Sequence, residues 1–335
     1  MKSILTILSI LFLMAGCGSK KYFEPKETFN PSKATSNYDG KIVDMTRDGA
    51  SLSNGFYIGK SGVVKIKLGE GYRFLNENSN YILTTNRDGI LKIIDKKSKT
   101  TLRKVDLQTP VVSATIKRGI VAYILNDNSF GLYRVKTNKK IMQNRSQQSF
   151  AVDTRASSPM FVDNLVVMPM LDGKLIIMNL SNTNNAKVIY ISSESSFNNI
   201  IFLSRIGNTM ISATSNKIIT IGNGGENEYS AHISEVALGD GKIYLFTKEG
   251  DIVVLNQQLK KLNSHRYKFA HFATAKVIGD KIYALDQQGS LIVTNSKLTY
   301  KRIYELDKIT EPVIIRGNKL YKDGKIINLS KLSYE

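Results

Sequence analysis

The chain has 335 residues, with 47 Lys and Arg against 28 Asp and Glu, a net charge of +19, one Cys and no Trp. A single cysteine excludes an intramolecular disulfide. The positive charge favours nucleic acid, anionic lipid headgroups, or acidic polymers and protein surfaces as partners.

Residues 1–16 have the organisation of an export signal. Lys2 is followed by an apolar run from Ile4 to Met14, which is too short for a membrane-spanning helix of about 20 apolar residues. A positive start, a short apolar run and small residues at the end are typical of a secretory signal. Export argues against nucleic acid as the partner.

The signal ends at the one cysteine. Met14-Ala15-Gly16-Cys17 resembles the lipobox of bacterial lipoproteins, which implies cleavage before Cys17 and lipid attachment at that residue. An ordinary secretory signal with a chance cysteine is the alternative. Gly18 and Ser19 follow, without the Asp that would imply retention in the inner membrane. We therefore expect a lipid anchor on the periplasmic face of the outer membrane.

Residues 17–40 are rich in Lys, Ser, Asn and Pro and show no apolar period. Such a composition cannot bury enough apolar surface to order itself. It predicts a flexible tether, so that with the lipid implied by the lipobox we expect a lipidated N-terminus and tether over 17–40, followed by a folded domain over 41–335.

A repeated unit fills the folded part. Its clearest copies are 159–179, 235–256 and 275–295, each with an apolar strand, a tight turn, a second strand, a Gly turn and a third strand. Asp-Gly and Asn-Gly pairs supply the positive φ angles of two-residue hairpins. The strands alternate and are rich in Ile, Val and Tyr, as half-buried strands are. No long window keeps a helical period, so the fold class is all-β.

The second turn of the unit recurs eight times, about 37 residues apart, close to the spacing of propeller blades. The turns contain Gly62, Gly89, Ser129, Gly173, Asn216, Gly250, Gly289 and Gly324. We predict a β-propeller of eight blades, with seven as the alternative because the first interval is short. The last copy stops before an outer strand, and the segment 41–45 is expected to supply it.

The repeat resembles that of quinoprotein-type propellers. With the lipobox and the length, it resembles the BamB family of outer-membrane assembly lipoproteins, over about residues 50–330. The resemblance implies a monomeric, non-enzymatic scaffold in a complex, bound to the periplasmic domains of the protein that inserts outer-membrane β-barrels. The missing Trp departs from the superfamily, argues against a quinone cofactor, and requires other large side chains between the blades.

One loop carries a sharper likeness. In the family, a loop reading roughly L-x-L-R-G-E-S-A-P contacts the partner, and residues 152–159 read VDTRASSP here. The resemblance assigns partner binding to Arg155 and Val152, with Thr154 replacing the second apolar position. At the next blade, the family's D-x-D contact is replaced by residues 197–199, so that Phe197 and Asn199 stand where carboxylates are expected.

No catalytic constellation is visible in the sequence. His232, His265 and His271 lack the spacing of metal ligands, and lipidation of Cys17 would leave no thiol nucleophile. We predict no enzyme activity, no metal and no cofactor. The alternative is a ligand- or glycan-binding propeller, or an enzyme, that uses its central channel. Charged side chains converging on that channel would favour the alternative.

Overall fold

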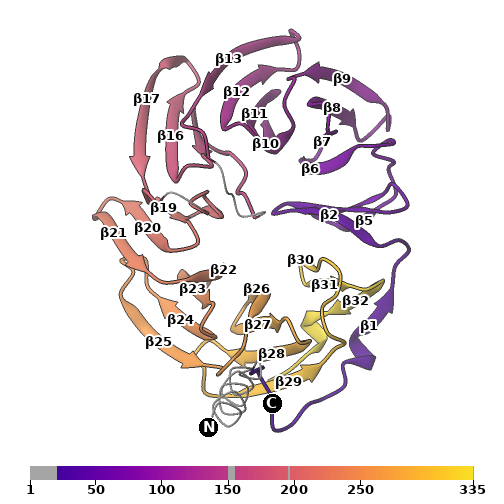
Figure 1. Cartoon of the computed structure of the whole chain (residues 1–335), viewed down its shortest axis with the longest axis vertical. Coiled ribbons are helices and arrows are strands. Elements are labelled where there is room, and N and C mark those ends of the chain that lie inside the picture. The colour runs from indigo at the N-terminus through magenta and orange to yellow at the C-terminus, as the bar shows by residue number, and fades with distance from the viewer. Residues whose placement is uncertain (1–20, 150–154, 195–196, 335) are drawn as a thin grey trace, which may run out of the picture.

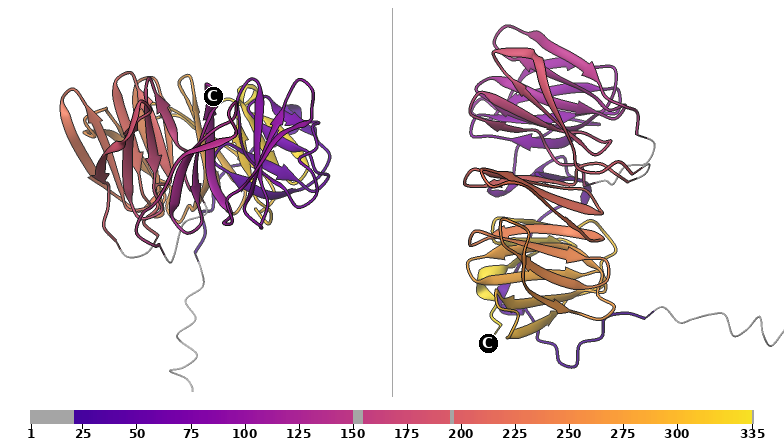
Figure 2. Two further views of the ribbon diagram at one scale, coloured as in Figure 1. Left: turned by 90° about the horizontal axis from the view of Figure 1, so that it is seen from above. Right: turned by 90° about the vertical axis from the view of Figure 1, so that its left-hand side faces the viewer.

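The computed structural model describes residues 21–149, 155–194 and 197–334. Within these ranges the chain forms eight antiparallel sheets of four strands, arranged as blades around a common axis (Figure 1). Two edge views show the sheets side by side in a broad disc (Figure 2). The prediction of an all-β propeller with eight blades is confirmed.

Each blade runs from an inner strand at the axis to an outer strand at the rim. The first four blades are β2 (Ile42–Thr46), β3 (Gly49–Leu52), β4 (Tyr57–Gly59), β5 (Gly62–Val64); β6 (Arg73–Glu77), β7 (Tyr81–Thr85), β8 (Ile90–Asp95), β9 (Thr101–Asp106); β10 (Val111–Lys117), β11 (Ile120–Leu125), β12 (Ser129–Arg134), β13 (Lys139–Arg145); and β14 (Met160–Val162), β15 (Leu165–Pro169), β16 (Lys174–Asn179), β17 (Asn182–Tyr190).

The other four blades follow the same order, except that the last takes its outer strand from the start of the chain. They are β18 (Phe202–Ile206), β19 (Thr209–Ala213), β20 (Lys217–Gly222), β21 (Gly225–Ser230); β22 (Ile233–Gly239), β23 (Lys242–Thr247), β24 (Asp251–Leu255), β25 (Lys261–Arg266); β26 (Phe272–Ile278), β27 (Lys281–Asp286), β28 (Ser290–Asn295), β29 (Lys301–Glu305); and β30 (Ile314–Arg316), β31 (Lys319–Lys322), β32 (Lys325–Asn328), β1 (Thr35–Asn37). Short 3-10 turns lie at Ser32–Ala34 and Leu329–Lys331.

The ring is closed by β1, which pairs antiparallel with β32. The expectation that 41–45 would supply this strand was wrong, because that segment forms β2 and opens the first blade. The tether predicted over 17–40 is also too long. Phe29 bridges to Tyr304, and β1 lies in the last blade. A short polar strand escaped detection because an outermost strand packs on one side only and needs no apolar period.

The short interval that left seven blades open has a simple cause. Gly62 lies at the turn between β4 and β5, whereas Gly89 lies at the turn between β7 and β8. The turn of the first blade that corresponds to Gly89 contains Gly55, between β3 and β4. The first blade is therefore complete and has short hairpins.

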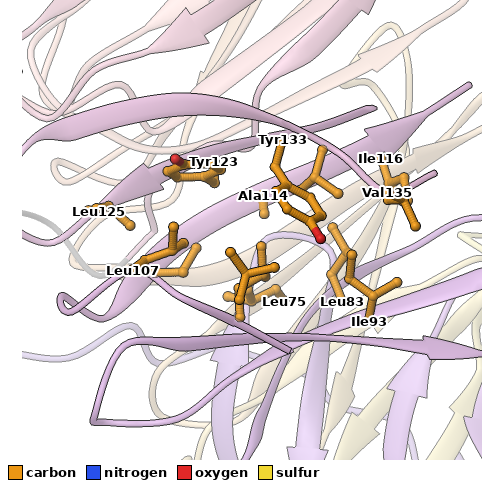
Figure 3. Packing of buried hydrophobic residues seen from close by; sticks show 14 residues of the cluster. Leu75, Leu83, Ile93, Leu107, Ala114, Ile116, Tyr123, Leu125, Tyr133 and Val135 are labelled. Carbon is orange, nitrogen blue, oxygen red and sulfur yellow. The ribbon is translucent and has the colours of Figure 1, made fainter. Parts of the chain in front are cut away.

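The hydrophobic core consists of eight clusters, each packed between two neighbouring blades. Figure 3 shows one of them, in which Tyr123 and Tyr133 lie among aliphatic side chains of the second and third blades. Tyr123, Tyr244 and Tyr283, from the second strands of three blades, are at most 1% exposed. Burial raises the pKa of Tyr283 to about 12. In this chain without Trp, tyrosine and aliphatic side chains thus fill the packed interfaces between neighbouring blades, which we call seams.

Two glycines allow the cost of a left-handed backbone to be measured apart from the cost of a steric clash. Gly289 has φ 100°, and an added Cβ would lie 2.2 Å from the carbonyl oxygen of Leu306, whereas Gly279 has φ 60° and open space around it. We predict that Gly279→Ala costs about 1–2 kcal/mol of unfolding free energy, from the left-handed backbone alone. Gly289→Ala should cost clearly more, because the methyl group must displace backbone. Denaturant unfolding of both variants measures this, and equal losses would contradict the packing argument.

Candidate functional site: the interblade loops and the axial channel

The loop assigned to partner binding connects the third blade to the fourth. Val152 and Thr154 lie outside the described residues. Arg155 is half-buried, lines the axial channel and is engaged within the protein. The backbone N–H of Ser157 donates to the carbonyl of Ile200 at 2.9 Å. Ile200 belongs to the next interblade connection, so the two segments predicted to bind a partner lie side by side.

The second segment, residues 197–199, connects the fourth blade to the fifth. Asn199 is fully buried and engaged within the protein, so a partner on this face would not reach it. Asn198 is 3% exposed, and its amide donates to the carbonyls of Ser192 at 3.0 Å and Asp172 at 3.3 Å. The two asparagines hold the loop in place rather than offering contacts.

Phe197 is the exposed member of this segment. Its side chain is 55% exposed, its φ is +51°, and its carbonyl accepts a hydrogen bond from Ser215 Oγ at 2.9 Å. A left-handed backbone costs a non-glycine residue about 1–2 kcal/mol, and local strain of this kind gathers at functional positions. An aromatic ring held outward on a fixed, strained loop has the properties of a binding contact.

Both connections run from an outer strand to the inner strand of the next blade, so they lie on the same face of the disc. We call this the connection face. The described chain also begins there. The ring of Phe23 packs edge-on against Tyr267, with centroids 5.8 Å apart, and Lys21 lies over the ring of Phe269 at 5.7 Å. Tyr267 and Phe269 belong to the connection between the sixth and seventh blades.

The axial channel is lined by the inner strands of all eight blades and encloses about 900 Å³. In Figure 1, β2 runs inward toward the centre of the ring. The turn after it, Arg47-Asp48, lines the channel, and its hydrogen bonds reach blades across the ring; we call it the crossing turn. Arg47 Nε donates to the carbonyl of Ile201 at 2.8 Å, and Arg47 Nη1 donates to both carboxylate oxygens of Glu235 at 2.7 and 2.8 Å. The first blade is thereby joined to the fifth and sixth, across the ring.

The other residue of the turn, Asp48, is held by side chains of two other segments of the chain. Asp48 Oδ2 accepts hydrogen bonds from Ser158 Oγ at 2.6 Å and from Asn76 Nδ2 at 3.0 Å. Burial raises the pKa of the Asp48 carboxyl, although the hydrogen bond from Ser158 and nearby Arg316 act in the opposite direction. The residue after the turn is Gly49, where an added Cβ would lie 2.2 Å from the carbonyl oxygen of Ile58, on β4 of the same blade.

Charged side chains thus converge on the channel, which is the observation that favours the ligand-binding alternative. Sequence reasoning missed Arg47, Glu235, Lys276 and Arg316. The available signal was a charge inside an otherwise apolar inner strand, as at Glu235 in ISEVALG and Lys276 in FATAKVI. Only the closed ring brings these distant residues together.

The remaining sequence candidates stay apart. His232 contacts Glu249, with Nδ1 and Oε1 2.6 Å apart, on an exposed surface. Within the described residues, no three His, Cys, Asp or Glu side chains are placed to hold a metal, and no helix there is long and apolar enough to cross a membrane.

No model of a known protein family matches the chain. Two plasminogen-binding proteins PgbB from Helicobacter pylori, of strains J99 and 26695, are 27% and 26% identical over alignments of 381 residues, which cover the whole chain and 70% of each relative. Among solved structures, BamB from Moraxella catarrhalis matches with a TM-score of 0.69 at 15% identity, over 87% of this chain and 97% of that one.

The fold is that of a BamB-like propeller. The C-terminal WD40 domain of Sif2 also matches, with a TM-score of 0.65 at 14% identity, over 88% of this chain and 98% of that domain. A likeness shared this widely establishes the architecture of the BamB-like ring. Its binding properties depend on the residues of its own surface.

The electrostatics of the crossing turn predict a pH-dependent stability difference. An Asp whose pKa is raised by folding destabilises the folded state once pH exceeds that pKa, and does not below its unfolded pKa of about 4. Asp48→Asn, which can still accept both hydrogen bonds, should therefore melt above the parent at about pH 7. The difference in melting temperature between the variant and the parent should disappear as the pH falls below about 4.

Thermal melts across this pH range check the prediction. The matched control is Asp39→Asn, a change at an exposed position outside the channel, which should not raise the melting temperature. If Asp48→Asn melts at or below the parent at neutral pH, the carboxyl is not penalised by burial.

Proposed function

We propose that the protein is a non-enzymatic, lipid-anchored scaffold that binds an outer-membrane β-barrel assembly protein through its connection face. The carrying observation is the junction of the two interblade segments, where Ser157 bonds Ile200 and Phe197 projects. The BamB-like fold supports the proposal at the level of architecture. Arg155, in the first of the two interblade segments, lines the channel and adds a positive charge there.

The position of the N-terminal segment gives the scaffold an orientation. Lys21 and Phe23 contact the connection face, and three residues separate Lys21 from Cys17. Four residue steps of extended chain span at most about 14 Å. With lipid on Cys17, the connection face would therefore be held toward the inner surface of the outer membrane.

The proposed contacts can be tested separately from folding. Phe197→Asn should weaken co-purification of the barrel-assembly protein by about tenfold or more, as loss of an aromatic hot spot does. Its stability should be kept or raised, because Asn tolerates a left-handed backbone. Arg155→Glu should also reduce recovery of the partner, since it places a negative charge at the rim. Crosslinked pull-downs from envelope membranes and thermal melts give the two readouts.

The matched control is Tyr300→Asn. Tyr300 is 63% exposed but lies at the turn between β28 and β29, on the opposite face of the disc. It should leave recovery of the partner unchanged. Undiminished recovery with a well-folded Phe197→Asn and Arg155→Glu would reject the connection face as the binding surface.

Binding of plasminogen is a second candidate function. It is favoured by the similarity to the PgbB proteins, which extends over the whole chain. The large excess of Lys and Arg would promote association with an acidic partner surface and make it sensitive to salt.

The two functions differ in where the protein must be displayed. If it binds plasminogen, the immobilised full chain should capture plasminogen at low ionic strength, and protease added to intact cells should cleave the chain. A scaffold on the periplasmic face should be protected until the outer membrane is opened. Protection in intact cells, together with no capture above that of an unrelated basic protein, would remove the second candidate.

A further inference from the structure

The axial channel has the dimensions of a ligand site. Its volume of about 900 Å³ falls within the range of small-molecule pockets, about 300–1,000 Å³. The Arg47-Asp48 turn forms part of its lining and brings polar groups into it. Such pockets bind ligands when a few convergent polar groups remain available. Whether each charged group of the lining already has a partner within the protein therefore decides which ligand the channel can bind.

The acidic groups of the lining are already engaged. Glu235 is bonded by Arg47, and Asp48 accepts from two neutral donors. Glu77 is paired with Lys96 and accepts from Tyr57. Asp44 lies 3.5 Å from Arg73.

The basic groups are less fully engaged. Lys276 and Lys60 have no side-chain hydrogen bond or ion pair among the described residues, and Lys117 reaches only the carbonyl of Phe161 at 3.5 Å. Around Asp48 the described lining places four cations, Arg47, Lys60, Lys276 and Arg316, against two carboxylates, Asp48 and Glu235. The cluster thus carries an excess of two positive charges.

Two guanidinium groups in this cluster carry unused donors. Arg47 Nη2 and Arg316 Nε are both buried and have no hydrogen-bond partner among the described residues. Arg316 uses Nη1 to donate to the carbonyl of Arg47 at 3.3 Å, which fixes the side chain and leaves Nε free. A buried donor without an acceptor is costly, more so when it is charged. Each of these N–H groups would be satisfied by an anionic oxygen.

Lys276 is the remaining cation of the cluster and comes from the seventh blade, next to the blade of Arg316. Its side chain is accessible from the channel, yet the surrounding protein and the charge of Arg316 lower the pKa of its amine, while Glu235 acts in the opposite direction. Two cations that repel one another across a cavity are stabilised together by an anion placed between them.

We propose that the axial channel binds a small anion with at least two phosphate or carboxylate groups, between Lys276, Arg316 and the unused donor of Arg47. Two negative charges match the local excess, and the unpaired N–H groups provide the hydrogen bonds. This proposal does not depend on the scaffold function, since the connection face and the channel use different side chains apart from Arg155 at the rim.

The test measures binding of pyrophosphate and of citrate to the full chain by calorimetry, with sodium chloride at matched ionic strength as the reference. Binding of either one above chloride supports the site and identifies phosphate or carboxylate as the preferred group. Lys276→Met should weaken that binding about tenfold or more, as loss of a charge-assisted contact does. The same variant should raise the melting temperature without ligand, because it removes a repulsive charge.

The matched control is Lys261→Met, at an exposed position on the rim strand β25. It should bind like the parent. The proposal is overturned if neither anion binds better than chloride, if both lysine variants lose binding equally, or if Lys276→Met melts below the parent and binds unchanged. Arg316→Gln, tested by its melt first, gives an independent second variant.

Discussion

The pairing of β1 with β32 is the contact on which the whole ring depends. Each blade buries its faces only against its two neighbours, so the eight apolar seams are complete only when the ring is closed. β30, β31 and β32 are followed by a 3-10 turn, and the fourth strand of that blade comes from Thr35–Asn37. Next to it, Tyr38 packs edge-on against Tyr321, with ring centroids 5.6 Å apart.

Closure also determines what lies at the axis. Eight inner strands leave more space than their own side chains fill, and the first blade contributes a turn that lines it. Arg47 ties this turn to Glu235, and Asp48 ties it to Ser158 and Asn76. Blades distant in the ring are therefore connected through polar contacts at the centre, while neighbouring blades are connected through apolar seams. The axial cluster is the polar counterpart of the eight clusters around it.

The same closure gives the disc two unlike faces. The segment that leads into β1 passes over the connection between the sixth and seventh blades, where Phe23 packs against Tyr267. The interblade loops with Arg155 and Phe197 lie on this face as well. If the chain is anchored at Cys17, the anchor and the proposed binding loops act on one side, and the propeller has far less freedom to orient than a tether over 17–40 would allow.

The sequence by itself determined the all-β class and the blade unit, and it favoured eight repeats over seven, because strand alternation and Gly turns are local properties. It also pointed to the segments around Arg155 and Phe197. Only the tertiary structure decided that Thr35–Asn37 closes the ring, that Gly62 lies one turn later than its apparent counterparts, and that Asn199 is buried while Phe197 projects. The axial cluster was equally hidden, because Arg47, Glu235, Lys276 and Arg316 are far apart in sequence. A position acquires its neighbours across the axis only when the eighth blade meets the first.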